Sequence, residues 1–155
     1  MNAIARILDP DHIRLGIEIA DKDDLFEKIG LIVEHGDGLA HDFVARRLSR
    51  REQAGSTGLG DGVAIPHARV KGLLRAQAIY VRPKQPIPFG SPDGTPVTDI
   101  LALLVPAPAR TEHLEILAEA AQMFSDHRFR KHLHACNDPG AVGRQFDAWT
   151  GSAAQ

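Results

Sequence analysis

The run from Thr98 to Val105 constrains the fold more than any other segment, because every residue after its first two is apolar. A strand without polar alternation is typical of a central strand that is buried on both faces of a sheet. A second strand is expected from Ala76 to Arg82, and Val63 to Ile65 forms a shorter apolar run that Pro66 ends. The sequence therefore predicts a sheet with both faces packed against other elements.

Helical segments lie on either side of these strands in the sequence, where apolar residues recur at helical spacing. The expected helices run from Asp21 to about Gly36, from Leu39 to Arg50, from Thr111 to Phe124, across Phe129 and Leu133, and from Asp138–Pro139 to Trp149. In the third helix the aligned residues are Leu114, Leu117, Ala118, Ala121 and Phe124. This order predicts an α/β fold, a mixed β-sheet flanked by helices in a sandwich. We expect a single domain over residues 5–149 and a flexible tail over residues 150–155.

The composition narrows the classes of function. With 18 basic and 20 acidic residues the formal net charge is −2, so nucleic acid is not expected as a partner. Arg46, Arg47 and Arg50 are interpreted as a solvated helix face, with a binding patch as the alternative. The longest apolar run is far shorter than the roughly 20 residues of a membrane-spanning helix. The N-terminus has no signal-peptide pattern and Cys136 is the only thiol, so a cytoplasmic protein without membrane insertion is expected.

Four glycines occur within the eight residues from Gly55 to Gly62, which we interpret as a loop too flexible for a regular element. The loop carries the hydroxyls of Ser56 and Thr57 and leads to His67, which is expected just past the end of a strand. A glycine-rich loop can turn several backbone N–H groups toward one phosphate, and Arg51 could add a two-pronged contact. A simple mobile turn would explain these glycines about as well.

The other histidines need no special role, since they lie in polar or helical surroundings. His127, His132 and His134 lack the spacing and the carboxylate or thiolate partners of common zinc motifs, so no metal is expected. The sequence also lacks a nucleotide-binding phosphate loop and a serine-hydrolase elbow. A histidine that accepts phosphate from another phosphohistidine would need neither nucleotide nor metal, and no cofactor is expected.

The continuous segment from Arg51 to His67 resembles the active-site signature of the fructose/mannitol-type enzyme IIA domains of the bacterial phosphotransferase system. The resemblance continues through Pro86–Ile87, Asp93–Gly94 and the His113–Leu114 pair, and it covers essentially residues 5–149. It implies that His67 is the phosphorylated histidine, that His113 lies beside it and that Arg51 is the arginine of the site. From the sequence alone His113 would be an ordinary helix residue. Ser56 and Thr57 are candidate phosphate-binding residues, although such hydroxyls more often fix the turn.

A lone domain resembles the nitrogen-regulatory enzyme IIA proteins more than the sugar-transport versions, which are often fused to other transport domains. The resemblance then implies an HPr-like phosphocarrier protein as donor, charged by an enzyme I that uses phosphoenolpyruvate. The expected targets are regulatory proteins such as potassium transport or sensor kinase components. Two alternatives stay open: a sugar-specific enzyme IIA that passes phosphate to a fructose/mannitol permease component, and a non-catalytic docking module. The apolar residues near the site, Leu59, Val63 and Ile65, could be core or docking surface.

Overall fold

Six strands form one mixed sheet in the computed structural model, which describes residues 2–108 and 110–151. The strands are β1 (Leu8–Ile17), β2 (Gly58–Gly60), β3 (Val63–Ala64), β4 (His67–Val70), β5 (Gln77–Pro83) and β6 (Asp99–Pro106). Their order is β1-β5-β6-β3-β2, and β4 also pairs with β6. Strand β6 runs antiparallel to β5 and parallel to β3 and β4, which confirms the prediction of a mixed sheet with β6 at its centre.

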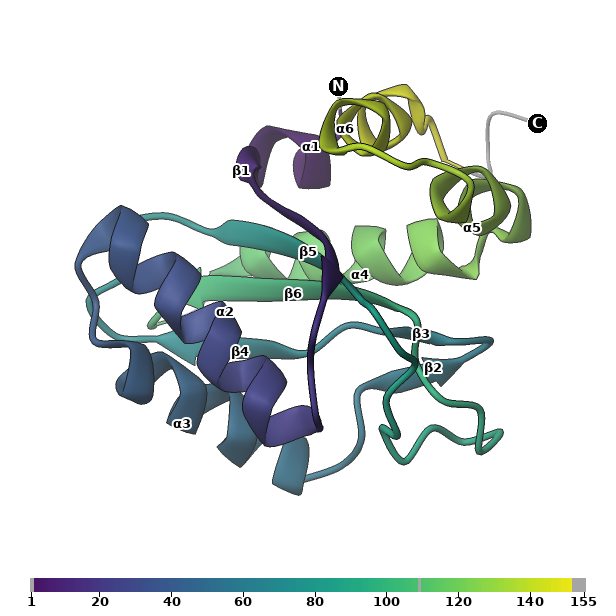
Figure 1. The fold of residues 1–155 in the computed structure, drawn as a ribbon. Helices are drawn as coiled ribbons and strands as arrows, with labels where there is room; N and C mark the ends of the chain where they lie inside the picture. The colour runs from purple at the N-terminus through teal and green to yellow at the C-terminus, as the bar shows by residue number, and fades with distance from the viewer. Residues whose placement is uncertain (1, 109, 152–155) are drawn as a thin grey trace.

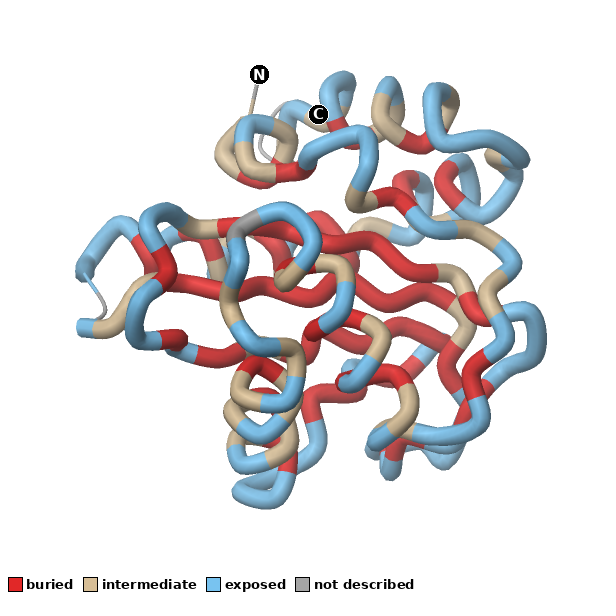
Figure 2. Tube along the Cα trace, turned by 60° about the vertical axis from the view of Figure 1, so that its left-hand side comes forward, coloured by how far each residue is buried: buried red, intermediate tan, exposed pale blue. Residues whose placement is uncertain are grey.

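Helices cover both faces of this sheet (Figure 1). They are α1 (Ala3–Ile7), α2 (Lys22–Asp37), α3 (His41–Gln53), α4 (Thr111–Ser125), α5 (His127–His134) and α6 (Pro139–Ala148). Helices α2 and α3 pack on one face, and α1, α4, α5 and α6 pack on the other. Strands β5 and β6 between these layers are buried along most of their length, whereas the helices expose their outer sides (Figure 2). The predicted helix-covered sandwich in a single domain is therefore confirmed.

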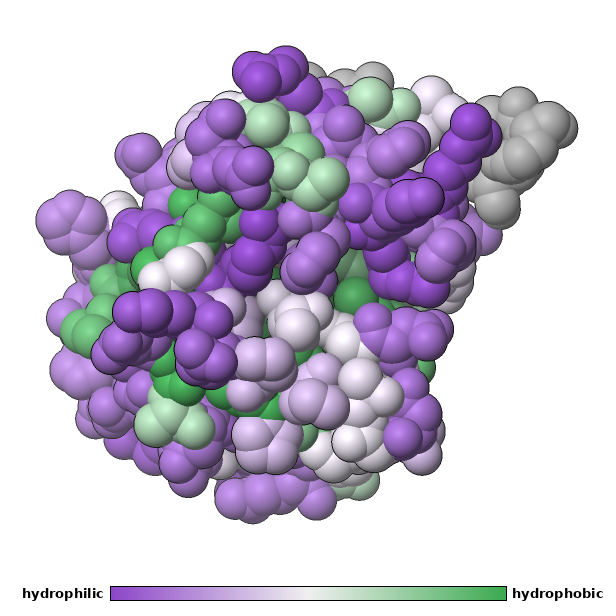
Figure 3. All heavy atoms as spheres, turned by 45° about the vertical axis from the view of Figure 1, so that its right-hand side comes forward, coloured by the Kyte–Doolittle hydropathy of each residue, from purple (hydrophilic) through white to green (hydrophobic). Residues whose placement is uncertain are grey.

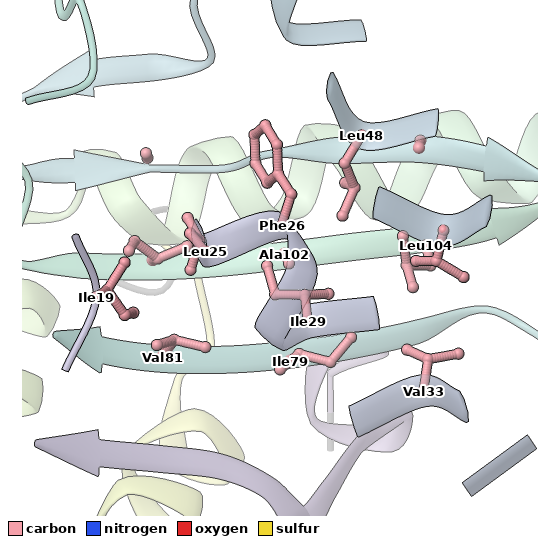
Figure 4. Packing of buried hydrophobic residues seen from close by; sticks show 14 of the residues in the cluster. Ile19, Leu25, Phe26, Ile29, Val33, Leu48, Ile79, Val81, Ala102 and Leu104 are labelled. Atoms are coloured by element: carbon pink, nitrogen blue, oxygen red, sulfur yellow. The ribbon is translucent and has the colours of Figure 1, made fainter. Parts of the chain in front are cut away.

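Strand β6 divides the core into two halves because its side chains point alternately to opposite faces. Ile100, Ala102 and Leu104 belong to the cluster beneath α2 and α3. Leu101 and Leu103 belong to the cluster beneath α4, α5 and α6. Figure 4 shows the first cluster, in which side chains of α2 and α3 meet those of β5 and β6. Filling both faces explains why the β6 sequence shows no polar alternation.

The prediction that the glycine-rich segment is entirely loop is wrong. Gly58–Gly60 is not loop but strand β2, which pairs with β3 through a two-residue turn at Asp61 and Gly62. Both turn residues have positive φ, 56° and 80°, and Asp-Gly is a preferred sequence for such a hairpin turn. His67 follows the end of β3 at Ala64, as expected, but after the break at Ile65 and Pro66 it also starts the new strand β4.

The N-terminal elements α1 and β1 were not expected from the sequence. Strand β1 contains Asp9-Pro10-Asp11, which reads as a breaker, but its position at the sheet edge tolerates proline and charge. The predicted face of α4 is only partly right. Phe124 is buried and Leu117 packs against the core, but Leu114 is exposed, and the buried residues are His113, Ile116, Ala120, Met123 and Phe124. Of the predicted tail, residues 152–155 lie outside the described part of the chain.

The outer surface is mostly polar. The face in Figure 3 shows hydrophilic side chains with hydrophobic atoms in patches between them. Over the described residues, no helix is both long enough and apolar enough to cross a bilayer.

Candidate functional site

His67 is positioned by the first residue pair of the β4–β6 ladder. It pairs with Leu103, and the backbone N–H of Leu103 donates to the carbonyl of Pro66 at 2.9 Å. The next residue, Ala68, belongs to the core beneath α2 and α3. Because side chains alternate along a strand, the His67 ring points to the opposite face, where α4 lies. The ring is half-buried at this edge of the sheet.

Two hydrogen bonds fix the tautomer of His67. Its Nδ1 lies 2.9 Å from the carbonyl oxygen of Ile65, which can only accept, so Nδ1 carries the proton and donates. The Nε of Arg51 donates to Nε2 of His67 at 3.2 Å. Nε2 therefore carries the lone pair, and Nε2 is the nitrogen available as a nucleophile.

The surroundings keep this ring neutral. Burial lowers the pKa of His67 below its ordinary value of 6.5, and the nearby Arg51 charge lowers it further. The hydrogen bond to Ile65 and the carboxylate of Glu52 act in the opposite direction. Since burial is the largest cause, the imidazole stays unprotonated at neutral pH and keeps its nucleophilic lone pair.

Arg51 joins the histidine to the glycine-rich segment. It lies in the last turn of α3, and its Nη1 donates to the carbonyl of Gly55 at 2.9 Å while its Nε reaches His67. A guanidinium held at two points keeps a fixed orientation, and its planar fork suits phosphate oxygens. The structure thus brings Arg51 and His67 together as expected.

The loop behind Arg51 is anchored by a buried carboxylate that the sequence did not single out. Glu52 accepts from the backbone N–H and the hydroxyl of Thr57, at 3.0 and 2.6 Å, and forms an ion pair with Lys22 at 2.8 Å. Ser56 donates its hydroxyl to the carbonyl of Phe89 at 2.6 Å. These bonds favour the alternative that the two hydroxyls fix the turn, and phosphate contact by Ser56 or Thr57 stays a prediction.

His113 lies on the other side of the site, at the third residue of α4. The backbone N–H of Arg110 donates to its Nδ1 at 2.9 Å, so the proton sits on Nε2. The residue is only 7% exposed. His113 and His67 line the same cavity, so the ring of His113 offers an N–H donor where His67 offers a lone pair.

The cavity is a groove of about 320 Å³ between the end of α3 and the start of α4, across β4 and β6. Its lining residues are Arg47, Arg50, Arg51, His67, Ala68, Arg69, Leu103, Val105, His113, Leu114 and Leu117. We call it the His67 groove. Ser56 and Thr57 do not line it. Val63 and Ile65 are core, as the first alternative held, whereas Leu59 is 44% exposed.

Several lining residues were missed or misread in the sequence. Leu114 and Leu117 were assigned to the buried face of α4; both line the groove, and Leu117 also packs against the core beneath α4. Arg47 and Arg50 were interpreted as a solvated face, but they share the groove side of α3 with Arg51. The spacing i, i+3, i+4 of these arginines is the signal that could have placed them together.

No three His, Cys, Asp or Glu side chains within residues 2–108 and 110–151 gather into an arrangement that could hold a metal ion. The polar side chains that line the groove are two imidazoles and four guanidiniums. A neutral imidazole with a directed lone pair can attack phosphorus, and adjacent cations and N–H donors can balance the charge of the transferred group.

Comparisons with known proteins show which family this chain resembles. The family model described as phosphoenolpyruvate-dependent sugar phosphotransferase system, EIIA 2, matches residues 6–148. A nitrogen regulatory protein of Bradyrhizobium diazoefficiens is 31% identical over 139 residues, which are 90% of this chain and 91% of that protein. Nitrogen regulatory protein IIA-Ntr from Neisseria meningitidis has a TM-score of 0.87 at 42% identity, covering 93% of this chain and 99% of that one.

A second solved structure shares the fold alone. IIA mannitol from Escherichia coli has a TM-score of 0.72 at 19% identity, and the match covers 88% of this chain and 96% of that chain. The family match confirms the resemblance inferred from the segment between Arg51 and His67. The chain belongs to the EIIA 2 family of the phosphoenolpyruvate-dependent sugar phosphotransferase system.

Proposed function

We propose that this protein carries a phosphoryl group on Nε2 of His67, which it accepts from an HPr-like phosphohistidine protein. The observation that carries this proposal is the fixed tautomer. The Nδ1–H of His67 donates to Ile65, so the lone pair is on Nε2, in the groove and beside Arg51. A family member without transfer activity would not need a histidine held in this state.

The transfer is balanced without any other reactant. Nε2 of His67 attacks the phosphorus of the donor's phosphoimidazole, a new N–P bond forms and the donor's N–P bond breaks. The leaving electron pair returns to the donor imidazole, which is again neutral. Throughout the step Nδ1–H of His67 keeps donating to the carbonyl of Ile65, and that carbonyl stabilises the positive charge that develops on the ring.

Arg51 and His113 would receive the charge of the transferred group. Arg51 can exchange its bond to Nε2 for a bond to a phosphoryl oxygen without changing its bond to Gly55. The Nε2–H of His113 would donate from the other side. Placing fixed donors where charge develops is commonly the largest contribution to such catalysis.

A regulatory output is the purpose that the comparisons support, since the two matched proteins reported above with more than 30% identity are nitrogen regulatory proteins. Phosphorylation replaces a neutral ring with a group that carries about two negative charges. That change in the His67 groove would alter which target the protein binds. Potassium transport and sensor kinase components stay predictions for the identity of that target.

The deciding experiment is phosphorylation of the purified protein by labelled phosphoenolpyruvate, enzyme I and an HPr-like donor. We expect an acid-labile, base-stable adduct in the wild type and none in His67→Ala. His35→Ala is the matched control because His35 is exposed on α2, on the far side of the sheet from α4. Labelling that survives in His67→Ala, or no labelling of the wild type by such donors, would contradict the proposal.

A further inference from the structure

The His67 groove has an uneven distribution of charge. Its charged lining side chains are Arg47, Arg50, Arg51 and Arg69, and among the described residues no carboxylate lines it, although Oε1 of Glu112 lies 3.8 Å from Nε2 of His113. The whole chain has a net charge of −2, so four positive charges are concentrated at one place on an otherwise slightly acidic protein. A phosphoryl group on His67 would neutralise part of this positive charge, which leaves the rest for another anionic partner.

The arginines of α3 lie on two different sides of the helix. Arg46 forms an ion pair with Asp42 at 3.0 Å and does not line the groove. Arg47 donates from Nε to the carbonyl of Arg69 at 3.2 Å, which holds its guanidinium at the groove rim. Arg50 is exposed on the same side. The groove arginines are thus separated from the acidic side chain that pairs with their neighbour.

The floor and the α4 side of the groove are apolar. Leu103 and Val105 form the floor, and Leu114 and Leu117 line the wall. Leu114 is 59% exposed although it is a large hydrophobic residue. An exposed leucine next to a preformed apolar hollow is typical of a surface that another protein covers.

We infer that the His67 groove docks a partner protein which inserts an apolar side chain between Leu114 and Val105 and sets acidic side chains against Arg47, Arg50 and Arg69. This inference rests on the proposed function, because the docked partner is one that exchanges phosphate with His67. Arginine is favoured at the rim of such interfaces because it forms bidentate bonds to carboxylates. A purely polyanionic partner would leave the apolar floor uncovered, so a nucleic acid fits the groove less well.

Charge reversal at the rim tests the acidic half of the inference. In Arg47→Glu/Arg50→Glu the second-order rate constant of transfer from the phosphorylated HPr-like donor should fall by about tenfold or more at low salt. Added salt should slow the wild type and should not slow the variant. Arg46→Glu, on the same helix but outside the groove, should behave as the wild type does. An unchanged rate and salt dependence in the double variant would overturn the inference.

A binding measurement separates this inference from the proposed function. Two short peptides serve as probes in an NMR titration of the unphosphorylated protein: one carries leucine between glutamates, the other leucine between lysines. The glutamate peptide should shift the amide signals of Ala68 and Leu114, and Leu114→Ser should weaken that binding. Preference for the lysine peptide, or binding of neither, overturns the inference even if His67 accepts phosphate. Binding of the glutamate peptide without any labelling of His67 overturns the proposed function alone.

Discussion

The two walls of the His67 groove present different chemistry. The α3 wall carries Arg51 and is fastened to the glycine-rich segment through Glu52, which is buried. The α4 wall carries His113, whose ring is held by the first turn of its own helix, and the apolar Leu114. In the proposed transfer, the braced α3 wall supplies the positive charge, whereas the α4 wall supplies one N–H donor and the docking surface.

The largest expected effect follows from removing the guanidinium of the α3 wall. Arg51→Ala should slow phosphorylation of His67 by about 100-fold or more, the usual result of removing one fixed donor to developing charge. Arg51→Lys keeps the charge but loses the fork, so it should recover only part of the rate. Single-turnover transfer from the phosphorylated donor measures both. Equal rates in Arg51→Ala and the wild type would mean that the α3 wall does not stabilise the transferred group.

The hydrogen bonds that hold the α3 wall to the glycine-rich segment can be removed without changing Arg51. Glu52→Ala leaves the buried N–H and hydroxyl of Thr57 without their acceptor, at a cost of about 2–4 kcal/mol in the free energy of unfolding. Thr57→Val removes the hydroxyl alone and should cost less. Urea denaturation monitored by circular dichroism measures the difference. A loss below that of Thr57→Val would show that Glu52 is not the anchor of the glycine-rich segment.

Much of this arrangement could be predicted from the sequence. The apolar run of β6 predicted its burial on both faces, because consecutive apolar residues in a strand place apolar side chains on both faces of the sheet. The hairpin of β2 and β3 was missed although Asp61-Gly62 is a strong turn signal, since the density of glycines suggested a loop. Strand β1 was missed because an edge position, which only the assembled sheet reveals, tolerates Pro10.

The site was harder to predict than the fold because its residues depart from periodicity. Helix α4 carries two apolar stripes, and the sequence does not reveal which one packs on the core. The structure buries Ile116 and leaves Leu114 at the groove. Similarly, only the assembled sheet shows that Arg69 shares the groove side of β4 with His67. In a sequence, an apolar residue on a docking surface looks like a core residue. Only the structure distinguishes the two, by showing which apolar side chains stay exposed.

A smaller effect is expected from the α4 wall. His113→Ala removes the Nε2–H donor and should slow transfer by about tenfold, a modest loss for one neutral hydrogen-bond donor. His113→Gln restores an N–H at a similar reach and should recover part of the rate. Far-ultraviolet circular dichroism should show an unchanged fold in both. A rate loss in His113→Ala as large as that in Arg51→Ala would contradict the proposed division of labour between the walls.

The smallest effect concerns the protonation of His67. Because burial lowers its pKa in the folded protein more than Arg51 does, an NMR titration should give a midpoint below 6.5, and Arg51→Gln should raise that midpoint only part of the way. The unfolded chain binds this proton more readily, so the contribution of His67 to stability is complete above pH 6.5. It is lost as the pH falls from 6.5 through the folded-state pKa. His67→Gln should therefore flatten the acid side of the stability curve over that window.

A midpoint at or above 6.5 in the wild type would mean that the ring is protonated more readily than its burial implies. Full recovery to 6.5 in Arg51→Gln would shift the cause from burial to the α3 wall.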